Sequence, residues 1–164
     1  MKTLFLSLAL SATALMAIPK TAVAQSADIT QIKAVIERET TAFNGRDAAA
    51  FADCWANVPE ASQLVIWQEP TGKNTIVSNR NTRQDMPTAA KAMIAGLGKP
   101  TGDTFQNADY QIRIKGDAAF AQYEQVVSKT DGKKEYAHET RYLEKTNGAW
   151  KIVHVGAVFY EPTK

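Results

Sequence analysis

The chain has 164 residues, of which 22% are charged and 45% are hydrophobic, and its formal net charge is +2. The single cysteine excludes an internal disulfide framework and a cysteine-rich zinc module. Six prolines and nine glycines are too few for a collagen-like or a Pro/Gly-rich disordered chain. The small net charge gives no reason to expect a nucleic-acid partner, so the function must be sought in a local site.

Residues 1–24 are typical of a secretory signal peptide. Lys2 provides the positive start, an apolar stretch runs over residues 4–18, and Ala22-Val23-Ala24 fits the small-x-small pattern of a signal-peptidase site. The apolar stretch is shorter than the ~20 residues that span a bilayer, which favours cleavage over a membrane anchor. We therefore expect a periplasmic or secreted protein with no membrane attachment after removal of the signal.

Residues 25–164 are predicted to form a single domain. The segment before them contains Lys2 and Lys20 and no acidic residue, so the mature chain is formally neutral. A chain of this size buries about 70% of the surface that its unfolded form exposes, which is enough for one real core.

Helices are predicted at the start of this domain. The apolar residues between positions 29 and 43 recur at helical spacing, and Asp28 is expected to cap this helix. Asn44-Gly45 is expected to end this helix, Asp47 can cap a second, short one, and a third is predicted over residues 86–97. The side of the first helix that faces solvent is assigned to Lys33, Glu37, Arg38 and Glu39.

Strands are predicted in the rest of the chain. One is expected over residues 62–69 and a short one near 75–77. The longer strands cover residues 108–115, 118–128, 135–145 and 149–160. Because tight turns join these long strands, they must be antiparallel neighbours. The expected fold class is α+β, with N-terminal helices packed in a strongly curved antiparallel β-sheet that forms a cone or half-barrel.

Two stretches of sequence carry a family resemblance. One is Ala42-Phe43-Asn44-Gly45-Arg46-Asp47, followed by Phe51, between the first two predicted helices. The other is Glu139-Thr140-Arg141 followed by Asn147-Gly148-Ala149-Trp150-Lys151-Ile152-Val153-His154 in the last hairpin. They resemble the nuclear transport factor 2-like (SnoaL-like, cystatin-like cone) superfamily. Within it, they are most similar to the association domain of calcium/calmodulin-dependent protein kinase and its stand-alone bacterial relatives.

The resemblance implies that Arg141 points into the cone, where an arginine of this family can bind a carboxylate. Two further family arginines correspond to Gln125 and Ala157 here, which leaves a pocket with a single arginine. A buried guanidinium needs a partner, because removing the partner of a buried charge costs about 3–5 kcal/mol. Glu139, two residues away on the same strand face, can be that partner, so a structural Arg141–Glu139 pair is the alternative to ligand binding.

The Asn147-Gly148 turn is compatible with two registers of the last hairpin. A two-residue turn sets Arg141 opposite His154, whereas a three-residue turn with a glycine bulge sets it opposite Val153. The family resemblance favours the second register. In that register the outer sheet face carries Tyr142, Trp150 and Ile152, which would suit a homodimer through the sheet, so a non-catalytic assembly module is one function to consider.

The function expected first is binding of a small, partly apolar acidic molecule in the cone, with a small carboxylate as the ligand and no assigned catalysis or cofactor. The residues expected to line this site are Arg141, Glu139, Tyr123, Gln125, Trp55, Trp67 and Phe159. Core packing is the alternative for the two tryptophans and the tyrosine.

An isomerase-, cyclase- or hydratase-type enzyme of the superfamily is the alternative function. Such an enzyme needs a carboxylate or histidine base inside the pocket, and the sequence offers Glu139 and His138. His138 and His154 are the only histidines, and no metal-ligand spacing, nucleophile elbow or phosphate-binding loop is present. We therefore expect no metal site.

Overall fold

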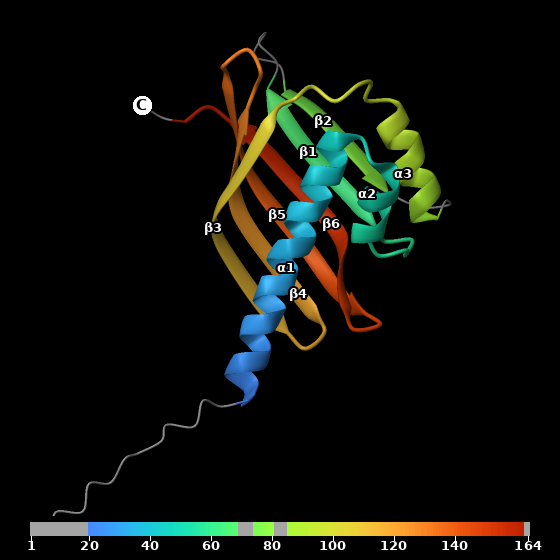
Figure 1. The fold of residues 1–164 in the computed structure, drawn as a ribbon, viewed down its shortest axis with the longest axis vertical. Helices are drawn as coiled ribbons and strands as arrows, with labels where there is room; N and C mark the ends of the chain where they lie inside the picture. Colours follow the sequence, from blue (N-terminus) through green and yellow to red (C-terminus); the bar gives the residue numbers. More distant parts are fainter. Residues whose placement is uncertain (1–19, 69–73, 81–84, 163–164) are drawn as a thin grey trace, which may run out of the picture.

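The computed structural model describes residues 20–68, 74–80 and 85–162, which form helices packed on one face of a six-stranded sheet (Figure 1). The helices are α1 (Lys20–Gly45), α2 (Ala48–Cys54) and α3 (Met86–Ala95). Residues 1–19 of the predicted signal peptide lie outside the described residues, and α1 begins just before its end. Among the helices of the described chain, none combines the length and the apolar character needed to cross a membrane.

Local sequence signals account for the helix ends, with one exception. α1 ends at Gly45 as predicted, and the carboxylate of Asp47 caps α2 by accepting hydrogen bonds from the N–H groups of Ala49 and Ala50 at 3.1 and 2.9 Å. The prediction that Asp28 caps α1 is wrong, because the helix starts earlier and Asp28 lies inside it. The Asp28 carboxylate instead accepts hydrogen bonds from side chains of the last hairpin, which ties α1 to the sheet.

The sheet confirms the predicted fold class. Its strands are β1 (Ser62–Gln68), β2 (Asn74–Arg80), β3 (Thr104–Lys115), β4 (Ala118–Ser128), β5 (Lys134–Thr146) and β6 (Ala149–Tyr160). They are arranged in the order β2-β1-β6-β5-β4-β3. Figure 1 shows the sheet curving around α1 without closing into a barrel. One pairing departs from the antiparallel expectation, because β1 runs parallel to β6.

The register of the last hairpin differs from both predicted alternatives. The turn has two residues, Asn147 and Gly148, both at positive φ, as in a type I′ turn, and pairs Thr146 with Ala149. A bulge then adds one residue to β6 between the partners of Tyr142 and Leu143, so that Arg141 lies opposite Val155.

The bulge also divides the predicted outer face. Tyr142 lies there, paired with His154, but Trp150 and Ile152 do not: they are buried in the core, 3% and 0% exposed. The prediction for these two residues is wrong because the single extra residue reverses the facing of β6 between its two halves. On the far side of the bulge from the turn, the residues of β6 face as predicted: Val155 and Ala157 lie on the concave side with Arg141.

The helices fill the concave side of the sheet with apolar side chains. α1 contacts β3 and β6, while α2 packs between α1, α3 and β6. The largest fully buried side chains of this core include Ile32, Ile36, Phe51, Leu143 and Ile152. Cys54 belongs to the same core and is a buried free thiol. The core leaves a polar region where α1 crosses β4 and β5.

Candidate functional site

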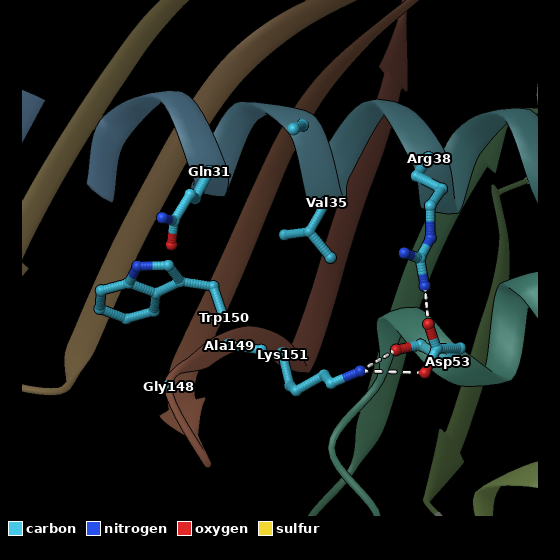
Figure 2. A pocket seen from close by; sticks show the side chains of 9 residues that line it. Gln31, Val35, Arg38, Asp53, Gly148, Ala149, Trp150 and Lys151 are labelled. Carbon is cyan, nitrogen blue, oxygen red and sulfur yellow. Dashed lines mark hydrogen bonds and ion pairs between the residues drawn. The ribbon is translucent and has the colours of Figure 1, made fainter. Parts of the chain in front are cut away.

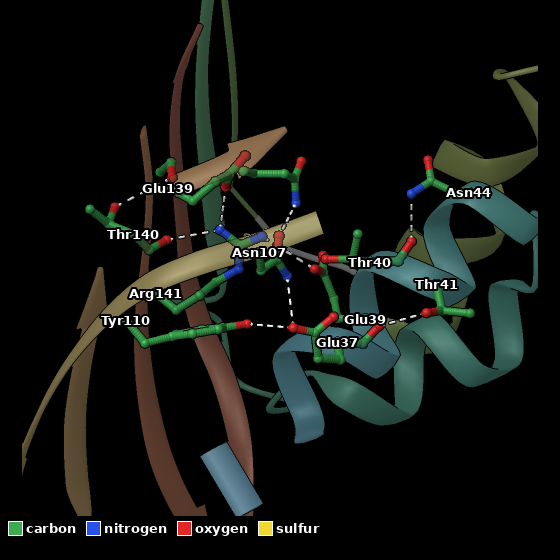
Figure 3. Close-up of polar contacts among 12 residues, drawn as sticks. Glu37, Glu39, Thr40, Thr41, Asn44, Asn107, Tyr110, Glu139, Thr140 and Arg141 are labelled. Carbon is green, nitrogen blue, oxygen red and sulfur yellow. Dashed lines mark hydrogen bonds and ion pairs between the residues drawn. The ribbon is translucent and has the colours of Figure 1, made fainter. Parts of the chain in front are cut away.

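Arg141 is the centre of the polar region inside the cone. Its guanidinium donates from Nη1 to Oε2 of Glu139 at 2.6 Å and from Nη2 to Oε2 of Glu39 at 3.3 Å (Figure 3). Nη1 also donates to the backbone carbonyl of Thr140 at 3.0 Å. The side chains of Arg141, Glu139 and Glu39 are 4%, 5% and 8% exposed, so this is a buried set of three charges.

The spacing of residues on β4, β5 and α1 explains why the side chains of this cluster meet. Glu139 and Arg141 are two residues apart on β5, so both point to the concave face. Tyr123 lies directly opposite Glu139 on β4, and its ring lies 5.5 Å from the Arg141 guanidinium carbon. Glu39 comes from α1, one helical turn after the buried Ile36, so it follows the apolar stripe of the helix onto the same region.

The charges in this set do not balance when both carboxylates are ionised, because two glutamates share one guanidinium. Burial raises the pKa of Glu39, the neighbouring Glu139 charge raises it further, and Arg141 opposes the shift only in part. The pKa of the Tyr123 phenol is also raised by burial. We therefore expect Glu39 to retain a proton more readily than an ordinary glutamate, and Tyr123 to act as a neutral hydrogen-bond donor.

Several buried polar atoms of the cluster residues and of Thr40, which follows Glu39 on α1, have no hydrogen-bond partner within the described residues. They are the hydroxyl of Tyr123, Oγ1 of Thr40 and Nε of Arg141. A buried polar atom left without a partner costs about 1–3 kcal/mol, so the described part of the fold retains unsatisfied donors on Tyr123, Thr40 and Arg141. A small molecule with hydrogen-bonding groups, or water, would satisfy them.

A second polar chain lies beside this cluster, at the edge of the sheet, and the rings of Tyr110 and Tyr123 are in contact between the two, with centroids 4.8 Å apart. Gln125 on β4 donates to Asn107 on β3 at 3.0 Å, and Asn107 donates to Oε1 of Glu37 at 3.2 Å. Tyr110 donates to the same oxygen at 2.7 Å (Figure 3). An irregular pairing between β3 and β4, with Asp109 at a φ of 55°, separates Asn107 from Tyr110. The irregularity lets both side chains reach α1.

The residues predicted to line the site divide into two groups. The first group lies together in the polar region: Arg141, Glu139, Tyr123 and, two residues along β4, Gln125. Trp55 does not join them. It pairs with Ile152, packs against Phe51 with ring centroids 5.7 Å apart, and belongs to the apolar core.

Trp67 and Phe159 lie farther along the neighbouring strands β1 and β6. The parallel register of these strands, with Val65 opposite Ala157, places both aromatic side chains on the concave face. Both are half-buried. They lie on the concave face beyond the Arg141 cluster, and within the described part of the chain no hydrogen bond or ring contact joins them to it.

The groups offered as a catalytic base are already paired. Glu139 contacts Arg141, and Nδ1 of His138 lies 2.8 Å from Glu124 on the outer face of the sheet. His154, also on that face, lies 3.0 Å from the Ser62 hydroxyl. Over the residues that the structure describes, no three His, Cys, Asp or Glu side chains are grouped so that they could hold a metal ion.

Glu39 is the functional candidate that sequence reasoning missed. It was assigned to the solvent side of α1, whereas its side chain is buried against Arg141. The signal was present in the spacing, because Glu39 is seven residues after Ile32 and three after Ile36, on the apolar stripe. A charged residue on such a stripe indicates a buried partner, and Arg141 is that partner.

Comparisons with known proteins agree with this architecture. Residues 32–159 match the SnoaL-like domain family. No curated protein matches the chain significantly.

Solved structures with the same fold cover most of the chain. A nuclear transport factor 2-like protein with a cystatin-like fold from Novosphingobium aromaticivorans is 17% identical, covers 92% of this chain and 94% of its own, and has a TM-score of 0.66. A protein of unknown function from Mycobacterium tuberculosis is 18% identical, covers 87% of this chain and 77% of its own, and has a TM-score of 0.62. A candidate dehydratase from Streptomyces avermitilis is 16% identical, covers 84% of this chain and 99% of its own, and has a TM-score of 0.56.

At these identities the solved structures show the fold alone, and they agree with the helices-on-curved-sheet architecture found here. The family match extends from the buried part of α1 to the end of β6, and so includes every residue of the Arg141 cluster. The chain belongs to the SnoaL-like domain family, within the nuclear transport factor 2-like, cystatin-like fold.

Proposed function

We propose that this protein is an exported domain that binds a small, partly apolar molecule inside the cone, with the polar end of the ligand at the Glu39–Arg141–Glu139 cluster. The observation that carries the proposal is the group of buried, unpartnered polar atoms on Tyr123, Thr40 and Arg141. The signal-like character of residues 1–24 supports the periplasmic or secreted location. Trp67 and Phe159, farther along the concave face, would contact the apolar part of the ligand.

The charges around Arg141 set the chemistry of this ligand. Two carboxylates already occupy the guanidinium, so a free ligand carboxylate would add a further negative charge to a buried set. A neutral carbonyl, amide or hydroxyl can use the Tyr123 hydroxyl and Arg141 Nε without that penalty. We therefore favour a neutral polar group over the acidic group that the sequence first indicated.

A matched pair of probes tests this proposal. Cyclohexanecarboxamide and cyclohexanecarboxylate share one ring and differ in the charge of the polar end. In an NMR titration of the mature protein to about 10 mM probe, we expect the amide to shift the signals of Tyr123 and Arg141, and the carboxylate to shift them less. The proposal fails if neither probe perturbs these residues.

Tyr123→Phe is the variant for this titration, because the hydroxyl that it removes has no partner among the residues that the structure describes. Stability without ligand should stay equal or rise, since an unsatisfied buried group is lost. Binding of the amide should weaken. Unchanged binding would show that the phenol takes no part in recognition.

An acid–base enzyme is the second candidate, and Glu39 is the observation that favours it. A buried carboxyl with a raised pKa, next to a guanidinium and a phenol, can give a proton to a bound molecule or take one from it. The isomerase, cyclase or hydratase type expected from the resemblance uses such a group, and one structural neighbour is a candidate dehydratase. Carbon-detected NMR of the Glu39 carboxyl tests this second candidate. If Glu39 titrates in the ordinary glutamate range, it is not a suitable acid–base group and the enzyme proposal is rejected.

Assembly is a separate proposal, supported by the outer face of the sheet. Phe120, Tyr142, Val158 and Tyr160 are 45%, 37%, 46% and 43% exposed, although they are large apolar or aromatic side chains. Phe120 and Tyr142 are cross-strand partners. We propose that two copies pair through this face, and the resemblance to the kinase association domain points the same way. Light scattering should give a dimer that Tyr142→Lys dissociates, and a monomer at high concentration would refute it.

A further inference from the structure

A groove outside the cone lies between α1, α2 and the tip of the β5–β6 hairpin (Figure 2). Its volume is about 410 Å³, which lies in the range of small-molecule sites. Ala34 and Val35 of α1 and Ala149 and Trp150 of β6 form apolar walls. Gln31 points toward the Trp150 ring from α1 in Figure 2.

The charged residues that line the groove leave it with a net positive charge. Asp53 is the one acidic residue of the lining, and it contacts both cations, Arg38 and Lys151. Lys151 Nζ lies 3.1 Å from Oδ1 of Asp53 and also donates to its backbone carbonyl. One carboxylate therefore faces two cations, the reverse of the balance around Arg141.

Arg38 retains hydrogen-bonding capacity in this groove. Its Nε donates to Sγ of Cys54 at 3.3 Å, and its Nη2 donates to Asp53. Within the described residues Nη1 has no partner, and Figure 2 shows this nitrogen on the side of the groove. The side chain is 51% exposed, so a ligand can reach it without the desolvation cost of a buried charge.

The apolar wall is held in place at its far end. The indole N–H of Trp150 donates to Asp28 at 3.0 Å, and Lys145 contacts the same carboxylate at 2.6 Å. The Lys145 ammonium also lies 5.0 Å from the centre of the Trp150 ring. This ring is therefore fixed before any ligand arrives, which reduces the entropy lost on binding.

We propose that this groove is a second binding site, separate from the cone, for a small molecule with a carboxylate and a compact apolar body. The carboxylate is bound by Arg38 Nη1 and the Lys151 ammonium, and the apolar body lies against Val35 and Trp150. The remaining nitrogen of the guanidinium can donate to one carboxylate oxygen, and the ammonium can donate to the other, as charge-assisted hydrogen bonds.

The test is an NMR titration of the full mature chain with cyclohexanecarboxylate, and with cyclohexanecarboxamide as the neutral control. The proposal predicts saturable shifts at residues 31–38 and 148–151 with the carboxylate, and weaker binding of the amide there. It is overturned if the carboxylate shifts only residues of the cone, if the amide binds this groove equally well, or if nothing saturates by about 10 mM. Signals from Tyr123 and Arg141 report cone binding separately, so either proposal can fail alone.

Two variants separate binding from a structural role. Lys151→Gln removes one cation and should weaken the carboxylate about fivefold, whereas Asp53→Asn frees both cations and should tighten it by a similar factor. Both variants break the same Asp53–Lys151 contact, so a purely structural role would move both affinities in the same direction. That result, or an Asp53→Asn variant that binds no more tightly, would overturn the proposal.

Discussion

The protonation of Glu39 gives the sharpest prediction, and Glu39→Gln is the variant that tests it. Glutamine keeps the shape of the side chain, can still accept from Arg141 through its carbonyl oxygen, and cannot ionise. In the native protein, burial raises the pKa of Glu39 above the value that it has in the unfolded chain. The folded state therefore binds more protons than the unfolded state between these two pKa values.

This difference in bound protons sets the direction and the size of the change in stability with pH. A carboxyl whose pKa is raised by folding makes its full contribution to stability below its unfolded-state pKa. That contribution is lost as the pH rises toward the folded-state pKa. The loss amounts to about 1.4 kcal/mol per pH unit within that window. Glu39→Gln should match the native protein near pH 4 and become increasingly more stable than it as the pH rises toward neutrality.

The assay is urea unfolding followed by tryptophan fluorescence at a series of pH values, and the relevant quantity is the difference between variant and native protein. Other carboxyls, such as Asp28 and Asp53, titrate equally in both proteins and cancel. Glu60→Gln, at an exposed loop residue, controls for the loss of a surface carboxylate. This prediction is refuted if the difference in the free energy of unfolding does not change with pH, or if the native protein becomes more stable relative to Glu39→Gln as the pH rises. Either result would show that Arg141 holds Glu39 ionised.

Three further variants test neighbouring parts of the structure. Arg141→Met should cost about 3–5 kcal/mol near pH 7, because it leaves two buried carboxylates together, and urea unfolding near pH 4 should show a smaller loss. Asp28→Asn should lower Tm by a few degrees near neutral pH and progressively less on acidification, because bonds from Lys145 and Trp150 lower the pKa of Asp28; an undiminished loss in acid would contradict this. Gly148→Ala should cost about 1 kcal/mol, because residue 148 has a φ of 80°, and equal stability would argue against the two-residue turn.

Short-range signals in the sequence predicted most of the elements. The Asp47 cap, the end of α1 at Gly45 and the long strands of the sheet follow from side chains within a few residues of each position. Asp28 shows where such a signal misleads. An aspartate before an apolar periodic run is typical of a cap, but partners more than a hundred residues away, Lys145 and Trp150, determine its role.

The register of β5 and β6 could not be predicted because its cause is not local. A turn sequence fixes pairing near the turn, whereas a bulge farther along depends on how both strands pack against the helices. The consequence was an error in the facing of Trp150 and Ile152. The concave facing of Arg141 came from the family resemblance and is confirmed. Its alternative partner Glu139 was predicted correctly because residues two apart on one strand share a face in any register.

The two arginine sites of this domain show why position alone does not identify an anion site. Arg141 lies at the point in the cone where the family resemblance implied a carboxylate ligand, but Glu139 and Glu39 already supply two carboxylates there. A third would have to enter as the neutral acid or displace one of them. Arg38 has a less conspicuous position on the exposed side of α1, yet it shares a single carboxylate with Lys151, and its Nη1 has no partner in the described part of the chain. The number of carboxylates per cation therefore favours the groove over the cone as the place where an acidic molecule binds.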